Sequence, residues 1–177
     1  DETARNAMFR DPNTQPTGPE GQGDWLHINC ASYLGPNKWY DQGDVRFHPD
    51  NIIMDSREGC FLFIISHQTG KIVWQLGPDY TSTKEARIIG PIIGPHGTHM
   101  VPSGMPGEGN ILIFDNGGWG GYGAPGQTSK IGLKTMHRDS TRILEINPTT
   151  MKIVWQFDAK TLGFPQLFAQ HYFYSPL

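Results

Sequence analysis

Four hydrogen-bond donors stand where a repeated strand pattern would gather them: His27, Asn29, Arg57 and His99. In the strand assignment given below, His27 and His99 take equivalent places on the innermost strands of neighbouring units. Asn29 shares a face with His27, because strand side chains alternate with period two. Arg57 ends the second strand of the first unit. Two imidazoles, a carboxamide and a guanidinium form a pocket with a fixed positive charge, which suits a tetrahedral oxyanion such as a sulfate or phosphate ester.

His96 is a further histidine in the same segment, three residues before His99. The approach through Gly94 and Pro95 allows a register shift, so His96 competes with His99 for the same role. If the strand has already begun at His96, the two side chains lie on opposite faces. A metal site formed by both is an alternative, although no carboxylate or cysteine stands at a ligand spacing nearby. Each of these residues, taken alone, is also explained as an ordinary surface or turn residue with its hydrogen bonds satisfied. The prediction of an anion-binding pocket therefore depends on the side chains lying close together.

An internal repeat supplies the elements that would position these residues. The pentapeptide K-I-V-W-Q starts at residues 71 and 152, which are 81 residues apart. Upstream, 63–70 corresponds to 144–151, 51–55 to 110–115 and 25–29 to 97–101, so each unit has four short strands. Four antiparallel strands joined by Gly, Asn and Pro turns are typical of a β-propeller blade, which buries its faces only by stacking on neighbours.

The predicted fold is therefore all-β, a partial β-propeller with about two four-stranded blades and the start of a third. We expect an extended arm over 1–23, a first blade over 24–80, a second over 95–160 and the start of the next over 168–177. Trp74 and Trp155 of the repeated pentapeptide are expected in the core between blades. Residues 117–138 form a glycine-rich insertion of the kind that borders a site. Because propellers typically have four to eight blades, other chains or a missing remainder must complete the ring.

Composition limits the partners. The chain has 14 Lys+Arg, 17 Asp+Glu and a formal charge of -3, with no basic cluster, so we expect no nucleic-acid partner. No apolar run approaches the roughly 18 residues of a membrane span. The first residues lack a signal-peptide pattern and are typical of a processed or truncated end. Cys30 and Cys60 either pair in an oxidising compartment or remain free thiols.

Several short segments, in this order, resemble the bacterial arylsulfate sulfotransferases over most of 24–160. They are D-W-L-H-I-N at 24–29, D-S-R at 55–57, T-G-K-I-V-W-Q-L-G at 69–77, and His99 followed by G-N-I-L-I-F-D-N-G at 109–117. The resemblance implies a six-bladed β-propeller. It also implies that an aryl sulfate sulfurylates a histidine, the phenol leaves and a second phenol collects the sulfuryl group, with no nucleotide donor and no cofactor. Family members are usually exported, which implies a periplasmic or secreted location.

Within this resemblance His99 corresponds to the nucleophile, with His96 as the competing candidate, and His27, Asn29 and Arg57 correspond to the sulfate-binding group. The chemistry requires a neutral imidazole nitrogen to attack sulfur and preorganised donors for the charge on three non-bridging oxygens. Arg57 would hold that charge and His27 would protonate the leaving phenoxide. The chain departs from the family by an insertion that starts at Leu34 and by Asp55 in place of a serine, so substrate access is expected to differ.

Two other functions fit the same strands. The segment at 69–74 also resembles blades of quinone-dependent dehydrogenase propellers, where the tryptophan motif is structural. That function would need acidic and amide ligands for a calcium ion near the cofactor, and the sequence has no such cluster. The second alternative is a non-catalytic propeller used for binding or assembly, which agrees with the incomplete ring.

Overall fold

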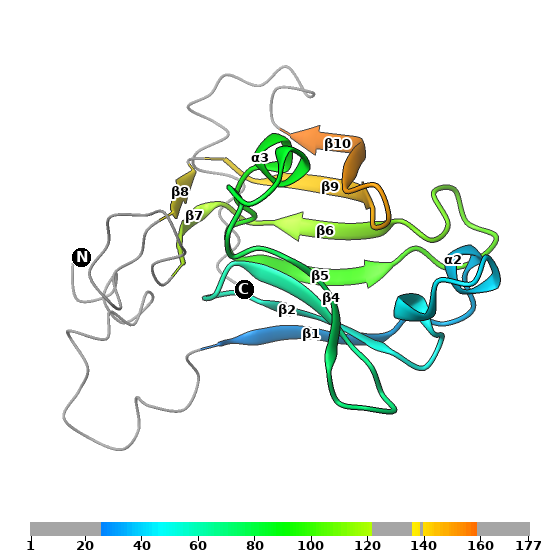
Figure 1. Cartoon of the computed structure of the whole chain (residues 1–177). Coiled ribbons are helices and arrows are strands. Elements are labelled where there is room, and N and C mark those ends of the chain that lie inside the picture. The colour runs from blue at the N-terminus through cyan, green and yellow to red at the C-terminus, as the bar shows by residue number, and fades with distance from the viewer. Residues whose placement is uncertain (1–25, 122–135, 139, 159–177) are drawn as a thin grey trace.

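The computed structural model describes residues 26–121, 136–138 and 140–158, and two four-stranded antiparallel sheets dominate them (Figure 1). The first sheet holds β1 (Ile28–Tyr33), β2 (Ile52–Ser56), β3 (Phe61–Ile65) and β4 (Ile72–Leu76) in chain order. The second holds β5 (Pro95–Met100), β6 (Ile111–Asp115), β9 (Arg142–Asn147) and β10 (Lys152–Asp158), with β5 and β10 at its edges. The all-β prediction with four strands per unit is confirmed. The expected arm at 1–23 and the segment 168–177 lie outside the described residues.

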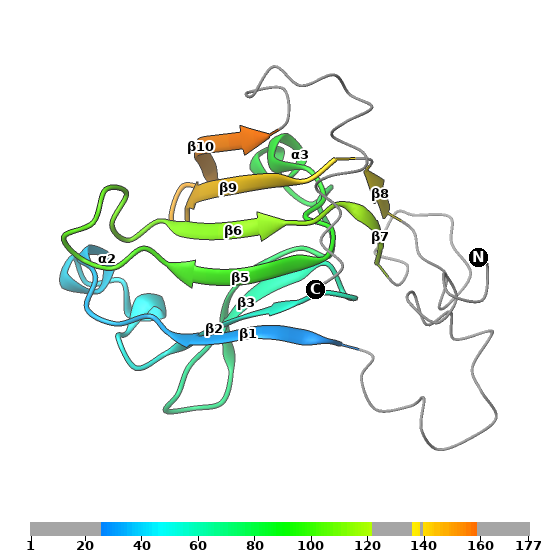
Figure 2. The same ribbon diagram turned by 180° about the vertical axis from the view of Figure 1, so that it is seen from behind.

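One apolar core lies between the two sheets. Residues from the middle strands of both sheets point into it, and the fully buried ones include Ile53, Leu62 and Ile64 from the first sheet and Ile113, Leu144 and Ile146 from the second. The two-residue spacing of Leu62 and Ile64, and of Leu144 and Ile146, is the period-two pattern of strand side chains. Strand β5 lies against β1 and β2, so the inner strands of the two sheets are neighbours (Figures 1 and 2).

The two repeated tryptophans differ in their surroundings. Trp74 is 6% exposed, and its Nε1 donates a hydrogen bond to the Pro148 carbonyl of the second sheet at 2.9 Å. Trp155 is 46% exposed. The prediction that both lie in the core is thus confirmed for Trp74 and wrong for Trp155. The reason is that Trp155 lies on the face of the second sheet turned away from the first, and no other sheet in the described part of the chain covers that face.

Short helices occupy two of the connections. Between β1 and β2 lie α2 (Lys38–Asp41) and the 3-10 helix η3 (Val45–Phe47), and between the sheets lies α3 (Lys84–Ile89). Asn37 and Thr83 cap α2 and α3 by accepting a backbone N–H. Trp39 of α2 donates to the Gly109 carbonyl at 2.6 Å, which ties the β1–β2 insertion to the β5–β6 connection. None of the helices in the described ranges is long and apolar enough to span a membrane.

A buried carboxylate joins the glycine-rich insertion to the second sheet. β7 (Gly118–Gly120) and β8 (Met136–Arg138) pair as a hairpin between β6 and β9, and residues 122–135 lie outside the described part. Asp115, at the end of β6, is 0% exposed and accepts the Ile93 N–H at 2.9 Å and the Arg142 Nε–H at 2.7 Å. It also pairs with Arg138 of β8, which donates to the Pro91 carbonyl at 2.9 Å. Asp115 therefore fixes three connections at once.

Both cysteines are free thiols, so the structure holds no bond between Cys30 and Cys60. Cys60 is buried in the β2–β3 turn, where the Tyr80 hydroxyl donates to its carbonyl at 2.9 Å. Burial raises the pKa of the Cys60 thiol to about 12. This cysteine is therefore a core residue rather than a reactive one.

Candidate active site at the start of the inner strands

The first residues of β1 and β5 meet, because the two strands run in the same direction side by side (Figures 1 and 2). The Asn29 Nδ2 donates to the Pro95 carbonyl at 3.4 Å. Further along, the Cys30 thiol donates to the Thr98 carbonyl at 2.9 Å. These two contacts align the strands and bring Asn29 close to the residue that follows Pro95, which is His96.

Arg57 reaches the same end of the sheets. Its backbone N–H donates to the His27 carbonyl at 2.9 Å. A Cβ on Gly94 would lie 3.8 Å from the Arg57 Cγ, so the aliphatic part of the Arg57 side chain lies beside the residue that precedes β5. The guanidinium pairs with Glu58, and the two side chains are 19% and 8% exposed. The negative charge of Glu58 therefore offsets the positive charge that the sequence predicts for Arg57. Sequence reasoning missed it, although an acidic neighbour directly after Arg57 was the available signal.

His27 lies immediately before β1 rather than within a strand. The inner strands were expected at 25–29 and 97–101, whereas β1 begins at Ile28 and β5 at Pro95. The φ of His27 is 46°, a left-handed conformation that costs a residue with a side chain on the order of 1–3 kcal/mol.

His99 corresponds to Ser32 and not to His27. In the first sheet the cross-strand pairs lead from Trp74 through Ile64 and Ile53 to Ser32. In the second they lead from Trp155 through Glu145 and Leu112 to His99. Because the two tryptophans are the same residue of the repeat, the predicted equivalence of His27 and His99 is wrong. His99 lies beyond the Cys30–Thr98 contact, several residues along the strand direction from His27.

His96 and His99 share one face of β5. His96 pairs with Phe114 and His99 with Leu112, and residues two apart on β6 point the same way. The expected opposite orientation fails because the register shifts between the two histidines, where Gly97 has a φ of 61°. Two strand positions place these side chains about 7 Å apart. The His99 Nδ1 lies 2.8 Å from the Gly97 carbonyl, which is a hydrogen-bond distance at which Nδ1–H can donate.

The described residues do not support a metal centre here. Within 26–121, 136–138 and 140–158, no group of three or more His, Cys, Asp or Glu side chains could hold a metal ion. The pair of His96 and His99 thus has no third ligand of these types in that part of the chain.

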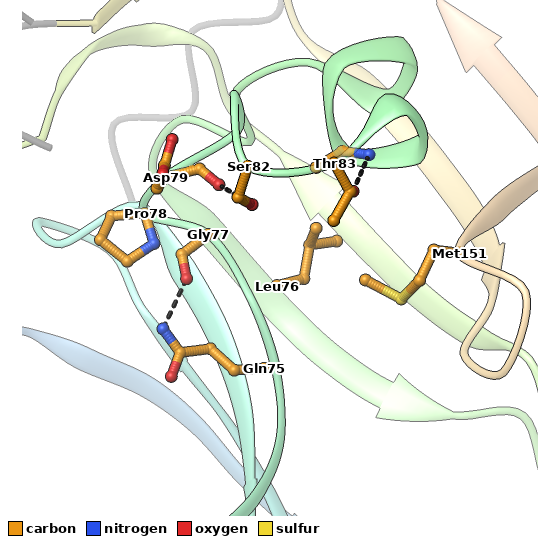
Figure 3. Close-up of a pocket in the computed structure, with 9 residues that line it drawn as sticks. Gln75, Leu76, Gly77, Pro78, Asp79, Ser82, Thr83 and Met151 are labelled. Carbon is orange, nitrogen blue, oxygen red and sulfur yellow. Dashed lines mark hydrogen bonds between the residues drawn. The ribbon is translucent and has the colours of Figure 1, made fainter. Parts of the chain in front are cut away.

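A hollow of about 450 Å³ lies away from these residues, where the end of β4 meets the start of α3 and the β9–β10 turn (Figure 3). Leu76, Ala86 and Met151 supply apolar surface. The polar side chains around it are engaged locally, since Gln75 donates to the Gly77 carbonyl at 2.6 Å and Thr83 caps α3. Its lining includes none of the predicted site residues, and we assign it no chemistry.

These features define an all-β protein of repeated four-stranded sheets, with imidazole, carboxamide and guanidinium groups near the start of its inner strands. The sequence profile of the family Arylsulfotransferase (ASST) matches residues 1–168, which is nearly the whole chain. The chain belongs to the arylsulfotransferase family. Membership indicates a transferase and, in general terms, aryl sulfotransfer. Comparisons with curated proteins and with solved structures gave no match.

Proposed function

We propose that the protein transfers a sulfuryl group from an aryl sulfate to a phenolic acceptor through a sulfohistidine, without a nucleotide donor. The observation that carries this proposal is that Asn29 contacts the Pro95 carbonyl and the Arg57 stem lies beside Gly94, the two residues that directly precede His96. An amide and a guanidinium are donors for sulfate oxygens, and a neutral imidazole is a nucleophile. Family membership supports the substrate class.

In the first half of the reaction the unprotonated imidazole nitrogen forms a bond to sulfur. The bond from sulfur to the aryl oxygen breaks, and its electron pair leaves on the phenoxide, which takes a proton. By analogy with phosphoryl transfer, positioning and charge stabilisation dominate such a step. Arg57 and Asn29 would hold the non-bridging oxygens, and His27 would supply the proton. In the second half the acceptor phenol loses its proton, its oxygen bonds to sulfur, and the histidine nitrogen is released.

Two histidines remain candidates for the nucleophile, and we propose His96. The support is its place directly after Pro95, whose carbonyl accepts from Asn29, and two residues after Gly94, which lies beside Arg57. His99, preferred from the sequence, lies further along the strand, past the Cys30–Thr98 contact. Its contact with the Gly97 carbonyl is the one observation in its favour.

We also propose that the two sheets are successive blades of a β-propeller. The second sheet covers the face of the first sheet that carries Trp74. On the corresponding face of the second sheet, Trp155 is 46% exposed. A further blade, from this or another chain, would cover it and close the ring. This exposed face is also what favours binding or assembly as a second candidate function. A periplasmic or secreted location remains a prediction.

The proposed activity is tested by incubating the purified chain with 4-nitrophenyl sulfate and phenol. We expect nitrophenol release that depends on phenol, that His96→Ala abolishes and that His67→Ala, in an exposed turn, leaves unchanged. Absence of release from the parent chain, or release that both variants retain in full, would refute the proposal. The native mass of the same sample tests assembly.

A further inference from the structure

The inner strands of both sheets each carry a bulge. In β1 the register shifts between Ile28 and Cys30, which leaves Asn29 as the extra residue. In β5 it shifts between His96 and His99, which leaves Gly97 and Thr98 opposite a single residue of β6. Bulges leave backbone groups without their ladder partners and turn side chains to new directions. Buried groups of this kind need partners from elsewhere.

Asp55 of β2 provides such a partner. It is 0% exposed, and its Oδ2 accepts the Thr98 N–H of the β5 bulge at 3.2 Å. Burial raises the pKa of this carboxyl, and the contact with Thr98, the nearby His96 and the Asn29 N–H of the β1 bulge offset this rise only in part. Its other oxygen, Oδ1, is buried and accepts no hydrogen bond from the described residues. Cys30, paired with Asp55 in the ladder, completes the contact by donating to the Thr98 carbonyl at 2.9 Å.

The β5 bulge decides where the histidines point. Without the extra residue, His96 and His99 would lie on opposite faces, because they are three positions apart. With it they share a face, paired with Phe114 and Leu112. The β1 bulge in turn sets the alignment of Asn29 with Pro95. Both bulges therefore belong to the geometry of the candidate site.

We propose that Asp55 is a positioning residue: its buried carboxylate holds the bulges of β1 and β5 together and so fixes His96 relative to Asn29. Cys30 assists from the same side. Asp55 is 0% exposed, so it acts through the strands that it contacts and not on the substrate directly. The catalytic part of this inference rests on the proposed sulfuryl transfer, whereas the structural part does not.

The test compares Asp55→Asn with Asp55→Leu in the full chain, by amide hydrogen exchange at Thr98 and by the rate of nitrophenol release. Asparagine keeps an acceptor for the Thr98 N–H, whereas leucine of similar size removes it. We expect Asp55→Leu to speed Thr98 exchange roughly tenfold and to lower kcat by a similar factor. We expect Asp55→Asn to retain both values. Asn51→Ala, which removes a buried amide remote from β5, controls for general loss of stability.

Unchanged Thr98 exchange in Asp55→Leu, or equal effects of leucine and asparagine, would overturn the role of the acceptor. If Asp55→Leu does not fold, Cys30→Ala replaces it, with faster Thr98 exchange expected and unchanged exchange contradicting the proposal. Faster exchange with an unchanged rate would overturn the positioning role and leave sulfuryl transfer standing. If the parent chain has no transferase activity, the exchange result alone decides whether Asp55 holds the bulges.

Discussion

Trp74 donates its indole N–H to the Pro148 carbonyl at 2.9 Å and so joins the outer strand of one sheet to the β9–β10 turn of the next. The contact is buried, and it couples a position of the repeat in the first unit to a turn of the second. It explains how two similar sheets stack in a fixed alignment. The chain also allows a buried and an exposed tryptophan to be compared at the same position of the repeat. Trp155 occupies that position in the second unit, and no sheet of the described residues covers it.

We predict that Trp74→Ala costs about 3–5 kcal/mol of unfolding free energy, because it empties a core site and removes a hydrogen bond. Trp155→Ala should cost less than about 1 kcal/mol, since the side chain is half exposed. Urea unfolding of both variants measures the difference. Equal losses would mean that the Trp155 face is covered in solution.

Asp115→Asn is expected to destabilise the chain by about 3 kcal/mol, because it leaves Arg138 and Arg142 without their buried partner. The matched control is Asp44→Asn, which weakens the partly exposed pair with Arg46 and should cost at most about 1 kcal/mol. Thermal unfolding monitored by circular dichroism compares the two. A smaller effect at Asp115 than at Asp44 would contradict the anchoring role.

Arg57→Lys should reduce kcat/KM for 4-nitrophenyl sulfate by roughly 100-fold, because an ammonium cannot reproduce the planar donor pair of a guanidinium. The unfolding midpoint should stay near that of the parent, since lysine can still pair with Glu58. Arg87→Lys, exposed on α3, serves as the control for the substitution itself. If rate and midpoint fell together, Arg57 would be structural.

Stability should decrease as the pH rises above 9. The Cys60 thiol ionises near 9.0 when exposed but near 12 in the fold, so between these values the folded state retains a proton that the unfolded state releases. Tyr80, whose pKa burial also raises, acts in the same direction from about pH 10. Urea unfolding across this range should give a falling free energy of unfolding, less steep in Cys60→Ala. A slope unaffected by this substitution would contradict the assignment.

The sequence predicts the strands better than it predicts the site. The repeated pentapeptide and the matching Asn51 and Asn110 segments place strands of both sheets, because alternation and turn residues are local properties. The alignment of His27 with His99 fails because His27 precedes β1, which begins at Ile28, whereas His99 is the fifth residue of β5, which begins at Pro95. Short strands without a repeated motif do not fix this offset in the sequence.

Contacts between the sheets were also hidden from sequence reasoning. Asp55 departs from the family pattern, and its carboxylate accepts a hydrogen bond from the Thr98 N–H of the neighbouring sheet. Trp155 is equivalent to Trp74 in the repeat, but its burial depends on what covers the second sheet. The contact of Asp55 and the burial of Trp155 both depend on segments far apart in the chain. The periodic pattern of a single strand carries no information about such contacts.

The most direct test of the central claim is to trap the sulfurylated enzyme with 4-nitrophenyl sulfate in the absence of a phenolic acceptor and to locate the modification by peptide mass spectrometry. We predict one sulfuryl group on the imidazole of His96, present in His99→Ala and absent in His96→Ala. A chain that releases nitrophenol without acquiring the group, or that carries it on His99 or a residue remote from β5, would contradict the account.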